Sequence, residues 1–205
     1  GLANESLRRA EATVLRNHVN SLPAGTNFII VGDYNTYSSG DSGFQALIGS
    51  QPNNNGRALD PLNLVGNWNS NASIARYHTQ SPRVRQFDGG ANGGLDDRFD
   101  IILTSASMQD NILTATYTAY GNDGNHYNDS INHPPNAAVP DSIANAIHNS
   151  SDHIPVFANF IFHSSSLPIQ LSAFNAVFIS GSVMLNWETL SETNKVATVV
   201  NMRGN

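Results

Sequence analysis

A short apolar run directly after a long helical pattern limits the fold of this chain more than any other part of the sequence. Between Asn4 and Leu22 apolar residues recur every three or four positions, the spacing of one helix face, with Asn4 as the expected N-cap and Pro23 as the stop. The expected apolar face consists of Leu7, Ala10, Val14, Leu15, Val19 and Leu22. Residues 27–31 then read Asn-Phe-Ile-Ile-Val, which is typical of a buried strand.

Shorter patterns along the chain complete the expected fold. Helices are predicted at residues 44–48 and 143–148, and strands at 74–79, 99–103, 112–120 and 155–162. This order differs from a regular parallel βαβ series, so it indicates an α+β fold. The segment 121–149 is longer than most loops of a compact domain, and such loops usually have a function.

A serine run at residues 164–166 divides the sequence into two parts. Residues 1–163 contain all of the elements above. Residues 164–205 start with the linker and continue with two expected strands, at 169–177 and 183–187. The second part therefore predicts a short β module that is separate from the first domain.

The composition limits the partners of the chain. Its formal net charge is −6 and only 13% of its residues are charged, so it lacks the broad basic face that holds proteins non-specifically on nucleic acid. It contains no cysteine, which excludes disulfides and thiolate metal sites. No apolar run reaches the length of a membrane span, about 18 residues. A surface of amides and hydroxyls suits a secreted or cell-surface protein, which we expect to be a monomer whose signal peptide lies outside this sequence.

Polar segments adjoin three of the expected strands. They read Gly-Asp-Tyr-Asn at residues 32–35, Arg-Phe-Asp at 98–100 and Ser-Asp-His at 151–153. Asp33 and Asn35 are two positions apart, so an extended chain would present both side chains on the same side. A carboxylate that binds metal or accepts a proton, beside an amide that donates to a phosphoryl oxygen, suits a phosphate substrate.

His153 needs a partner that orients its ring, and Asp100 is the candidate, while Asp152 adds a hard oxygen ligand beside the imidazole. If Asp100 accepts from the ring, the two side chains should lie about 2.6–3.2 Å apart. Simpler interpretations stay open. The Gly-Asp-Tyr-Asn segment alone is often an Asx turn, Asp100 could pair with Arg98 or cap a loop, and Asp152 and His153 could mark the end of a helix or strand.

Together and in this order, the three segments resemble the endonuclease/exonuclease/phosphatase superfamily, which includes secreted deoxyribonucleases and sphingomyelinases. That family follows Gly-Asp-Phe-Asn with Arg-Ile/Phe-Asp and, near the end of the domain, with Ser-Asp-His-x-Pro-Val. This chain matches all three motifs between residues 4 and 162, with Tyr34 at the Phe position. The resemblance implies one half of a four-layer α/β/β/α sandwich, followed by a short C-terminal β segment.

The resemblance also implies a role for each motif residue. Asp33 would orient or deprotonate the attacking water, and Asn35 would hold the phosphoryl oxygens. His153 would donate to the scissile phosphate while Asp100 fixes its ring, and Asp152 would sit at the metal, directly or through water. The implied metal is Mg²⁺, with Mn²⁺ or Ca²⁺ as alternatives, because the candidate ligands Asp33, Asn35 and Asp152 are hard oxygen donors.

Weaker candidates lie beside or outside these motifs. Arg76 and Arg98 could contact phosphate, although a solvated loop explains Arg76 equally well. A second metal site could form from the loop histidines, but scattered loop histidines are more often solvated; they are His126, His133 and His148. Packing rather than base stacking is the favoured role of two aromatic residues, Trp68 and Tyr77.

The chain departs from the family pattern at both ends. The family's Asn and Glu metal ligands lie in the N-terminal half of the domain, and a catalytic His commonly precedes the helix that here begins at Asn4. None of these positions falls in this sequence, so we expect weak Mg²⁺ binding, little turnover and an uncovered apolar sheet face until that half is restored. Residues 167–194 resemble the fibronectin-like module that precedes type IX sorting domains, but residues 195–205 do not.

The favoured function is Mg²⁺-dependent hydrolysis of phosphate esters by in-line attack of water, in an extracellular nuclease. The preference for nucleic acid is an analogy with secreted family members that carry such tails. A phosphomonoesterase or sphingomyelinase of the same superfamily is the second interpretation, which the negative net charge favours mildly. A non-catalytic binding module that retained the fold is the third.

Overall fold

The computed structural model describes residues 2–85, 89–162, 169–179 and 182–192, which form an α+β fold. The helices are α1 (Leu2–Asn20), α2 (Ser42–Ile48) and α3 (Asp141–Ser150), with short 3₁₀ helices η1 (Ala72–Tyr77) and η2 (Ala106–Met108). The strands are β1 (Ile29–Asp33), β2 (Ala58–Leu59), β3 (Asp100–Ser105), β4 (Ile112–Ala119), β5 (Val156–Phe160), β6 (Ile169–Ile179) and β7 (Ser182–Glu192). The expected α+β class is thus confirmed.

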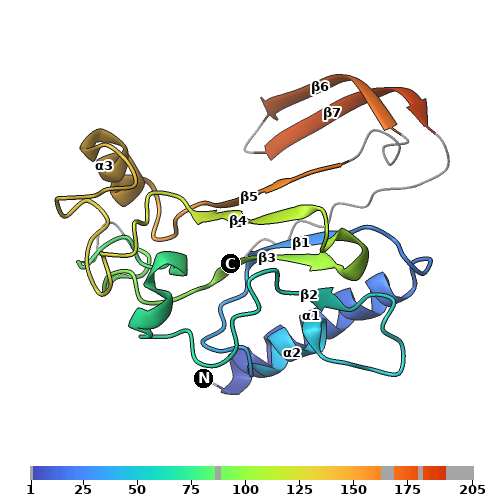
Figure 1. The fold of residues 1–205 in the computed structure, drawn as a ribbon, viewed down its shortest axis with the longest axis horizontal. Helices are drawn as coiled ribbons and strands as arrows, with labels where there is room; N and C mark the ends of the chain where they lie inside the picture. The colour runs from blue at the N-terminus through green and yellow to red at the C-terminus, as the bar shows by residue number, and fades with distance from the viewer. Residues whose placement is uncertain (1, 86–88, 163–168, 180–181, 193–205) are drawn as a thin grey trace.

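The strands form antiparallel sheets that lie in layers. The first sheet has the order β1-β3-β2, and β4 pairs with β5 in a second one. Helices α1 and α2 cover one face of the first sheet, and β4 and β5 lie on its other side (Figure 1). β6 and β7 pair with each other over the two tail segments that were expected to be strands, whereas the predicted linker at residues 164–166 lies outside the described residues.

Helix α1 is present as expected, but its buried face is rotated from the predicted one. Ala12, Leu15 and Val19 are buried, whereas Leu7 is 60% and Val14 is 70% exposed. Asn4 lies inside the helix, so the expected N-cap is wrong. The buried face of the helix includes a charged residue, Arg16, which is fully buried and faces α2. Apolar spacing alone does not predict a buried arginine, so it predicted a different face.

Arg16 is that buried residue, and it ties α1 to α2 and to the loop that follows. Its guanidinium donates to the carbonyl oxygens of Leu47 at 2.8 Å and Gly49 at 3.0 Å, and to Asn54 Oδ1 at 3.1 Å. Burial, with the charge of Arg57 adding, lowers the pKa of Arg16. Neutral oxygens therefore solvate a buried cation at the centre of the helical layer.

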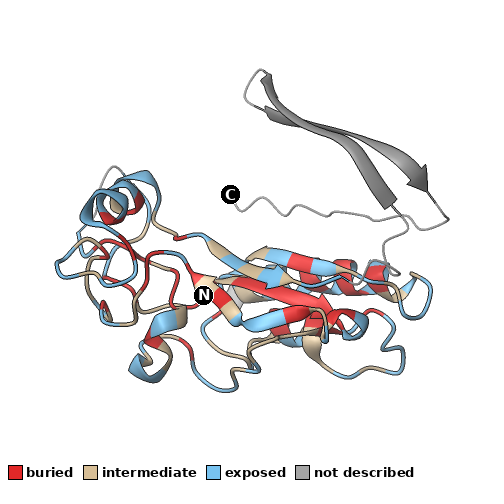
Figure 2. Cartoon of the chain, turned by 45° about the horizontal axis from the view of Figure 1, so that its top comes forward, coloured by how far each residue is buried: buried red, intermediate tan, exposed pale blue. Residues whose placement is uncertain are grey.

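The main core lies between the helices and the first sheet (Figure 2). Phe44 of α2 packs edge-on against Trp68, with ring centroids 4.9 Å apart, which confirms the packing role of that tryptophan. A smaller buried cluster joins the long loop and α3 to the neighbouring segments; its members are Leu95, Ala119, Ile131, Ile147 and Ile154.

Residues 72–77 form η1, so the strand predicted at 74–79 is wrong. The side-chain oxygen of Asn71 accepts from Ser73 N at 3.1 Å and starts a helical turn. Ile74 is half-buried and Ala75 is buried. The apolar content of this segment had suggested a strand. The local cap therefore outweighs the strand propensity of the following residues.

Apolar side chains remain exposed on the sheets. Ile29 and Val31 of β1 are 40% and 46% exposed, and Phe157 of β5 is 45% exposed. On β1 these residues alternate with buried Ile30, which faces the helices. The uncovered apolar face that the sequence predicts is thus present on β1.

Candidate active site

Two carboxylates meet where β1 ends and β3 begins. Asp33 is the last residue of β1, Asp100 is the first of β3, and the two are direct partners in the antiparallel register. Directly opposed residues of neighbouring antiparallel strands place their side chains on the same face of the sheet. The fold therefore brings together two acidic groups that lie far apart in the sequence.

His153 stands against this carboxylate pair from the segment before β5. Its Nδ1 lies 2.7 Å from Asp100 Oδ2, and its Nε2 lies 3.9 Å from Asp33 Oδ2. The predicted contact between His153 and Asp100 is therefore confirmed. The imidazole and the Asp100 side chain are each 23% exposed and Asp33 is 34% exposed, so a ligand can reach them from solvent.

The negative charges around His153 perturb its titration and that of Asp33. Burial opposes the charged imidazole, but the hydrogen bond and charge of Asp100, with Asp33 and Asp152 adding, outweigh it and raise the pKa of His153. Burial also raises the pKa of Asp33; His153 and the Asn35 N–H oppose this change only in part. Both the imidazole and the Asp33 carboxylate are thus more basic than usual, which suits acid–base chemistry.

Thr79 holds the two halves of the site together, and sequence reasoning missed it. Its hydroxyl oxygen accepts from the backbone N–H of Phe99 at 3.1 Å and of Asp100 at 3.0 Å. Its carbonyl oxygen accepts from Ile154 N at 2.9 Å, and the residue is 1% exposed. A single buried threonine thereby fixes the backbone that carries Asp100 against the backbone beside His153. Nothing in the local sequence signals this role, because it depends on contacts with distant segments.

Gln80 is the second residue that the sequence did not indicate. Its side-chain Nε2 lies 2.5 Å from His153 Nε2. An amide nitrogen can only donate, so His153 Nε2 accepts in this contact and Nδ1 carries the proton that is donated to Asp100. Asp100 and His153, called the dyad below, therefore form a hydrogen-bonded chain of three groups together with Gln80.

Asn35 follows Asp33 in a turn rather than in an extended strand. Its φ is 48°, in the left-handed region, and its N–H donates to Asp33 Oδ1 at 2.8 Å. The Asx turn that was left open is therefore present, and the expectation that both side chains follow strand alternation is wrong. The Asn35 side chain is exposed beside Asp33, while Tyr34 between them packs inward against Phe44.

Asp152 binds a glycine-rich loop that passes over it. Its Oδ2 accepts from Ala91 N at 2.7 Å, and a Cβ on Gly90 would lie 2.8 Å from Asp152 Cγ. The carboxylates of Asp33 and Asp152 each use one oxygen in such a backbone contact. Within the described residues, no group of three or more His, Cys, Asp or Glu side chains is arranged to hold a metal ion.

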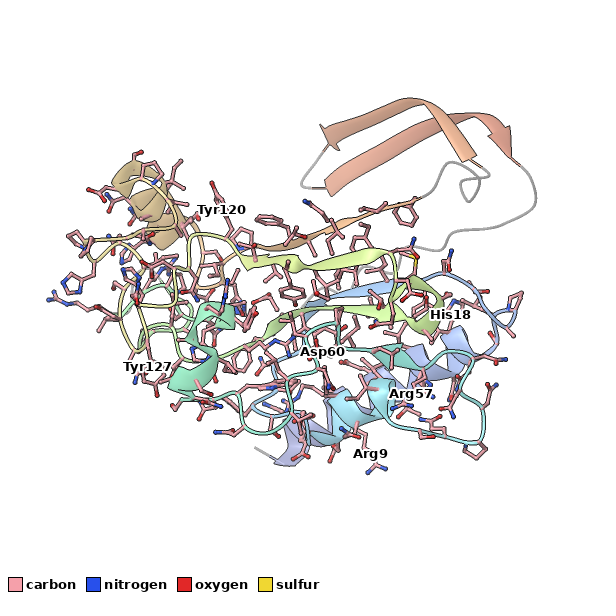
Figure 3. All side chains as sticks on the ribbon, viewed as in Figure 1. Arg9, His18, Arg57, Asp60, Tyr120 and Tyr127 are labelled. Carbon is pink, nitrogen blue, oxygen red and sulfur yellow. The ribbon has the colours of Figure 1, made fainter. Side chains whose placement is uncertain are left out.

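Arg98 does not reach the site, so its predicted role in substrate binding is wrong. Its side chain is 0% exposed and forms a bidentate ion pair with Asp60, with N–O distances of 2.8 and 2.9 Å. Its guanidinium also lies over the Trp68 ring, 4.9 Å from the centroid. Asp60, labelled in Figure 3, follows directly on β2, so the pair joins the sheet to the core.

Arg76 and the loop histidines lie apart from the dyad. Arg76 is exposed on η1, with its guanidinium 5.4 Å from the Tyr77 ring centroid, and among the described residues no hydrogen bond or ion pair joins it to Asp33, Asp100 or His153. The solvated interpretation is wrong for His126, which is 3% exposed. Its ring nitrogens lie 2.8 Å from Asp123 Oδ1 and 2.7 Å from the carbonyl oxygen of His133.

Comparison with known proteins found no family model, no curated protein and no solved structure that matches this chain. The functional assignment therefore rests on the site residues and on the motif resemblance. In the described ranges, none of the helices has the length and apolar character needed to cross a membrane.

Proposed function

We propose that this chain belongs to a hydrolase of phosphate esters, with a phosphodiester of nucleic acid as the favoured substrate. The observation that carries the proposal is the contact of 2.7 Å between His153 and Asp100, with Asp33 facing the other ring nitrogen. An imidazole fixed by a carboxylate and opposed by a second, more basic carboxylate provides a proton donor and a proton acceptor on one surface.

His153 acts as the donor in the proposed reaction. When protonated, its Nε2–H donates to a phosphoryl oxygen and stabilises the negative charge that grows as water attacks phosphorus. Asp100 keeps the ring oriented and stabilises its positive charge. Asp33 accepts the proton of the attacking water through Oδ2, the oxygen that faces His153. The phosphorus–oxygen bond to the leaving group then breaks, the leaving oxygen takes up a proton from solvent water, and Asp33 returns its proton to solvent.

A divalent metal fits the donor types of the site. Asp33 and Asp152 offer hard carboxylate oxygens and Asn35 an amide oxygen, as Mg²⁺ prefers, and Mn²⁺ or Ca²⁺ can use the same donors. Mg²⁺ in phosphoryl-transfer sites is commonly held by one or two carboxylates together with substrate oxygens and water. When bound, the ion supplies neutralisation of charge on the phosphoryl oxygens.

The layers of the fold support the finer proposal of one half of an α/β/β/α sandwich. Helices cover one face of the first sheet, and β4 with β5 lies on its other side (Figure 1). The exposed apolar side chains of Ile29, Val31 and Phe157 suit coverage by further sheet residues. Secretion, a monomeric state and a fibronectin-like tail remain predictions from the sequence.

A phosphomonoester is the second candidate substrate. The burial of Arg98 removes a cation that was expected to contact phosphate, and the net charge of the chain is −6. A nucleic-acid backbone binds best where several basic side chains neutralise its phosphates, whereas a small ester needs only the donors of the site.

The test compares diester and monoester hydrolysis by the chain in Mg²⁺ and in excess EDTA. Plasmid DNA, bis(p-nitrophenyl) phosphate and p-nitrophenyl phosphate serve as substrates, at high protein concentration because turnover is expected to be slow. His153→Ala should abolish hydrolysis, whereas His18→Ala, at an exposed residue of α1 labelled in Figure 3, should leave it unchanged.

Each outcome decides between the candidates. Cleavage of the diesters supports a nuclease, and cleavage of the monoester alone supports a phosphomonoesterase. Phosphate binding that requires His153, without turnover of any ester, supports a binding module that retained the fold. Hydrolysis that persists in EDTA or survives His153→Ala overturns the proposal.

A further inference from the structure

We propose that Gln80 is a substrate-binding residue of this site. In the free chain its amide fills the hydrogen-bonding position of His153 Nε2. When a phosphoryl oxygen takes that position, the amide moves aside and donates to the same oxygen. This inference rests on the proposed function, because it assumes that His153 Nε2 meets a phosphate.

Backbone hydrogen bonds hold Gln80 in place, and among the described residues its side chain has one hydrogen-bond contact, with His153. Its N–H donates to the carbonyl oxygen of Asp97 at 3.1 Å, and its own carbonyl oxygen accepts from the N–H groups of Asp96 and Asp97, both at 3.0 Å. The side chain extends to His153 Nε2, at 2.5 Å. A fixed backbone with a long, flexible amide places a donor at the site without ordering a new segment of chain on binding.

The position of the amide coincides with that expected for a substrate oxygen. An oxygen that accepts from Nε2–H lies about 2.7–3.2 Å from the nitrogen, which is the space that the Gln80 amide fills. Asp33 Oδ2 lies 3.9 Å from the same nitrogen, so an oxygen bound there would also lie near the proposed base. In the free chain, Gln80 thus occupies the position at His153 Nε2 that an arriving phosphoryl oxygen would take over.

The charge of the site explains why an amide suits this position. Asp33, Asp100 and Asp152 all act on His153, so an incoming phosphate meets three carboxylates. A neutral N–H donor adds attraction for an anionic oxygen without repelling it. A carboxylate in place of Gln80 would instead compete with the phosphate for His153 and add a fourth negative charge.

The experiment titrates the 205-residue chain with inorganic phosphate and follows the ring nitrogens of His153 by NMR. Gln80→Met keeps the length of the side chain and removes the donor, and we expect it to weaken phosphate binding by about tenfold, the loss of one charge-assisted hydrogen bond. Gln80→Glu should weaken it further. Gln45→Ala removes a glutamine that is exposed on α2 and should leave binding unchanged.

A measurement without phosphate tests the contact itself. In the free chain, Gln80→Met should shift the Nε2 resonance of His153, because that nitrogen loses its donor, and circular dichroism checks that the variant is folded. Phosphate binding that requires His153 but is unchanged or tighter in Gln80→Met overturns the role of Gln80 and leaves the proposed function standing. No response of wild-type His153 to phosphate overturns both.

Discussion

Replacing Arg98 by Met should destabilise the fold and spare the chemistry, contrary to a role in substrate binding. The Arg98 guanidinium is 0% exposed and donates twice to Asp60, whose side chain is 6% exposed. Without it, Asp60 keeps only backbone donors, from Leu62 at 3.1 Å and Leu64 at 3.3 Å, to stabilise a buried charge. Breaking a buried ion pair from one side typically costs about 3–5 kcal/mol, and these two weak bonds place our expectation near 3–4 kcal/mol of unfolding free energy.

Urea unfolding followed by circular dichroism measures this cost, and a double variant isolates its cause. Removing both charges, in Arg98→Met with Asp60→Leu, leaves no unpaired ion, so the double variant should be more stable than either single variant by about 2 kcal/mol or more. A loss below about 1 kcal/mol in Arg98→Met, together with weaker phosphate binding by the folded variant, would refute this reasoning. It would show that Arg98 reaches solvent and substrate.

Other contacts give further predictions. Arg16→Met should lower the unfolding free energy by about 3 kcal/mol in a urea titration, because the carbonyl oxygens of Leu47 and Gly49 lose their buried donor. Burial raises the pKa of Asp97 to about 6, so its favourable effect on folding is present at acid pH and lost as the pH rises through that value. Asp97→Asn should therefore stabilise the fold near pH 8, by about 1–2 kcal/mol after allowance for solvent screening, and change it little near pH 4; equal effects at both pH values would contradict this. Asp100→Asn should lower the pKa of His153 in an NMR titration and move the alkaline limb of any rate profile to lower pH. An unchanged titration would exclude Asp100 as the orienting group.

The sequence predicted those parts of the fold that depend on local pattern. Helix α1, strand β1 and strand β3 lie close to their expected positions, since apolar spacing and strand propensity are properties of neighbouring residues. The three motifs likewise indicated the contact between His153 and Asp100. The need of an imidazole for an orienting acceptor suggested this pair, and the family resemblance implied the same one.

The parts that were missed depend on partners far along the chain. Asp60 lies 38 positions before Arg98, and no feature of the sequence between them marks the pair. Gln80 lies 73 positions from His153, directly after a segment that was assigned to a strand. Buried polar groups are satisfied by whatever the tertiary fold brings near, so their roles become visible only when the fold is known.

The hydrogen bonds of Thr79 affect how well the chain tolerates insertions and deletions between the two site residues. Asp100 and His153 are 53 positions apart, yet the hydroxyl and carbonyl of one threonine set the spacing of the two backbones that carry them. The exposed residues 133–135 and 137–138, which lie between them, therefore do not have to hold these two side chains in place. Insertions or deletions in that stretch could reshape the surface around the site, and so the range of ligands it admits, while the spacing of Asp100 and His153 stays the same.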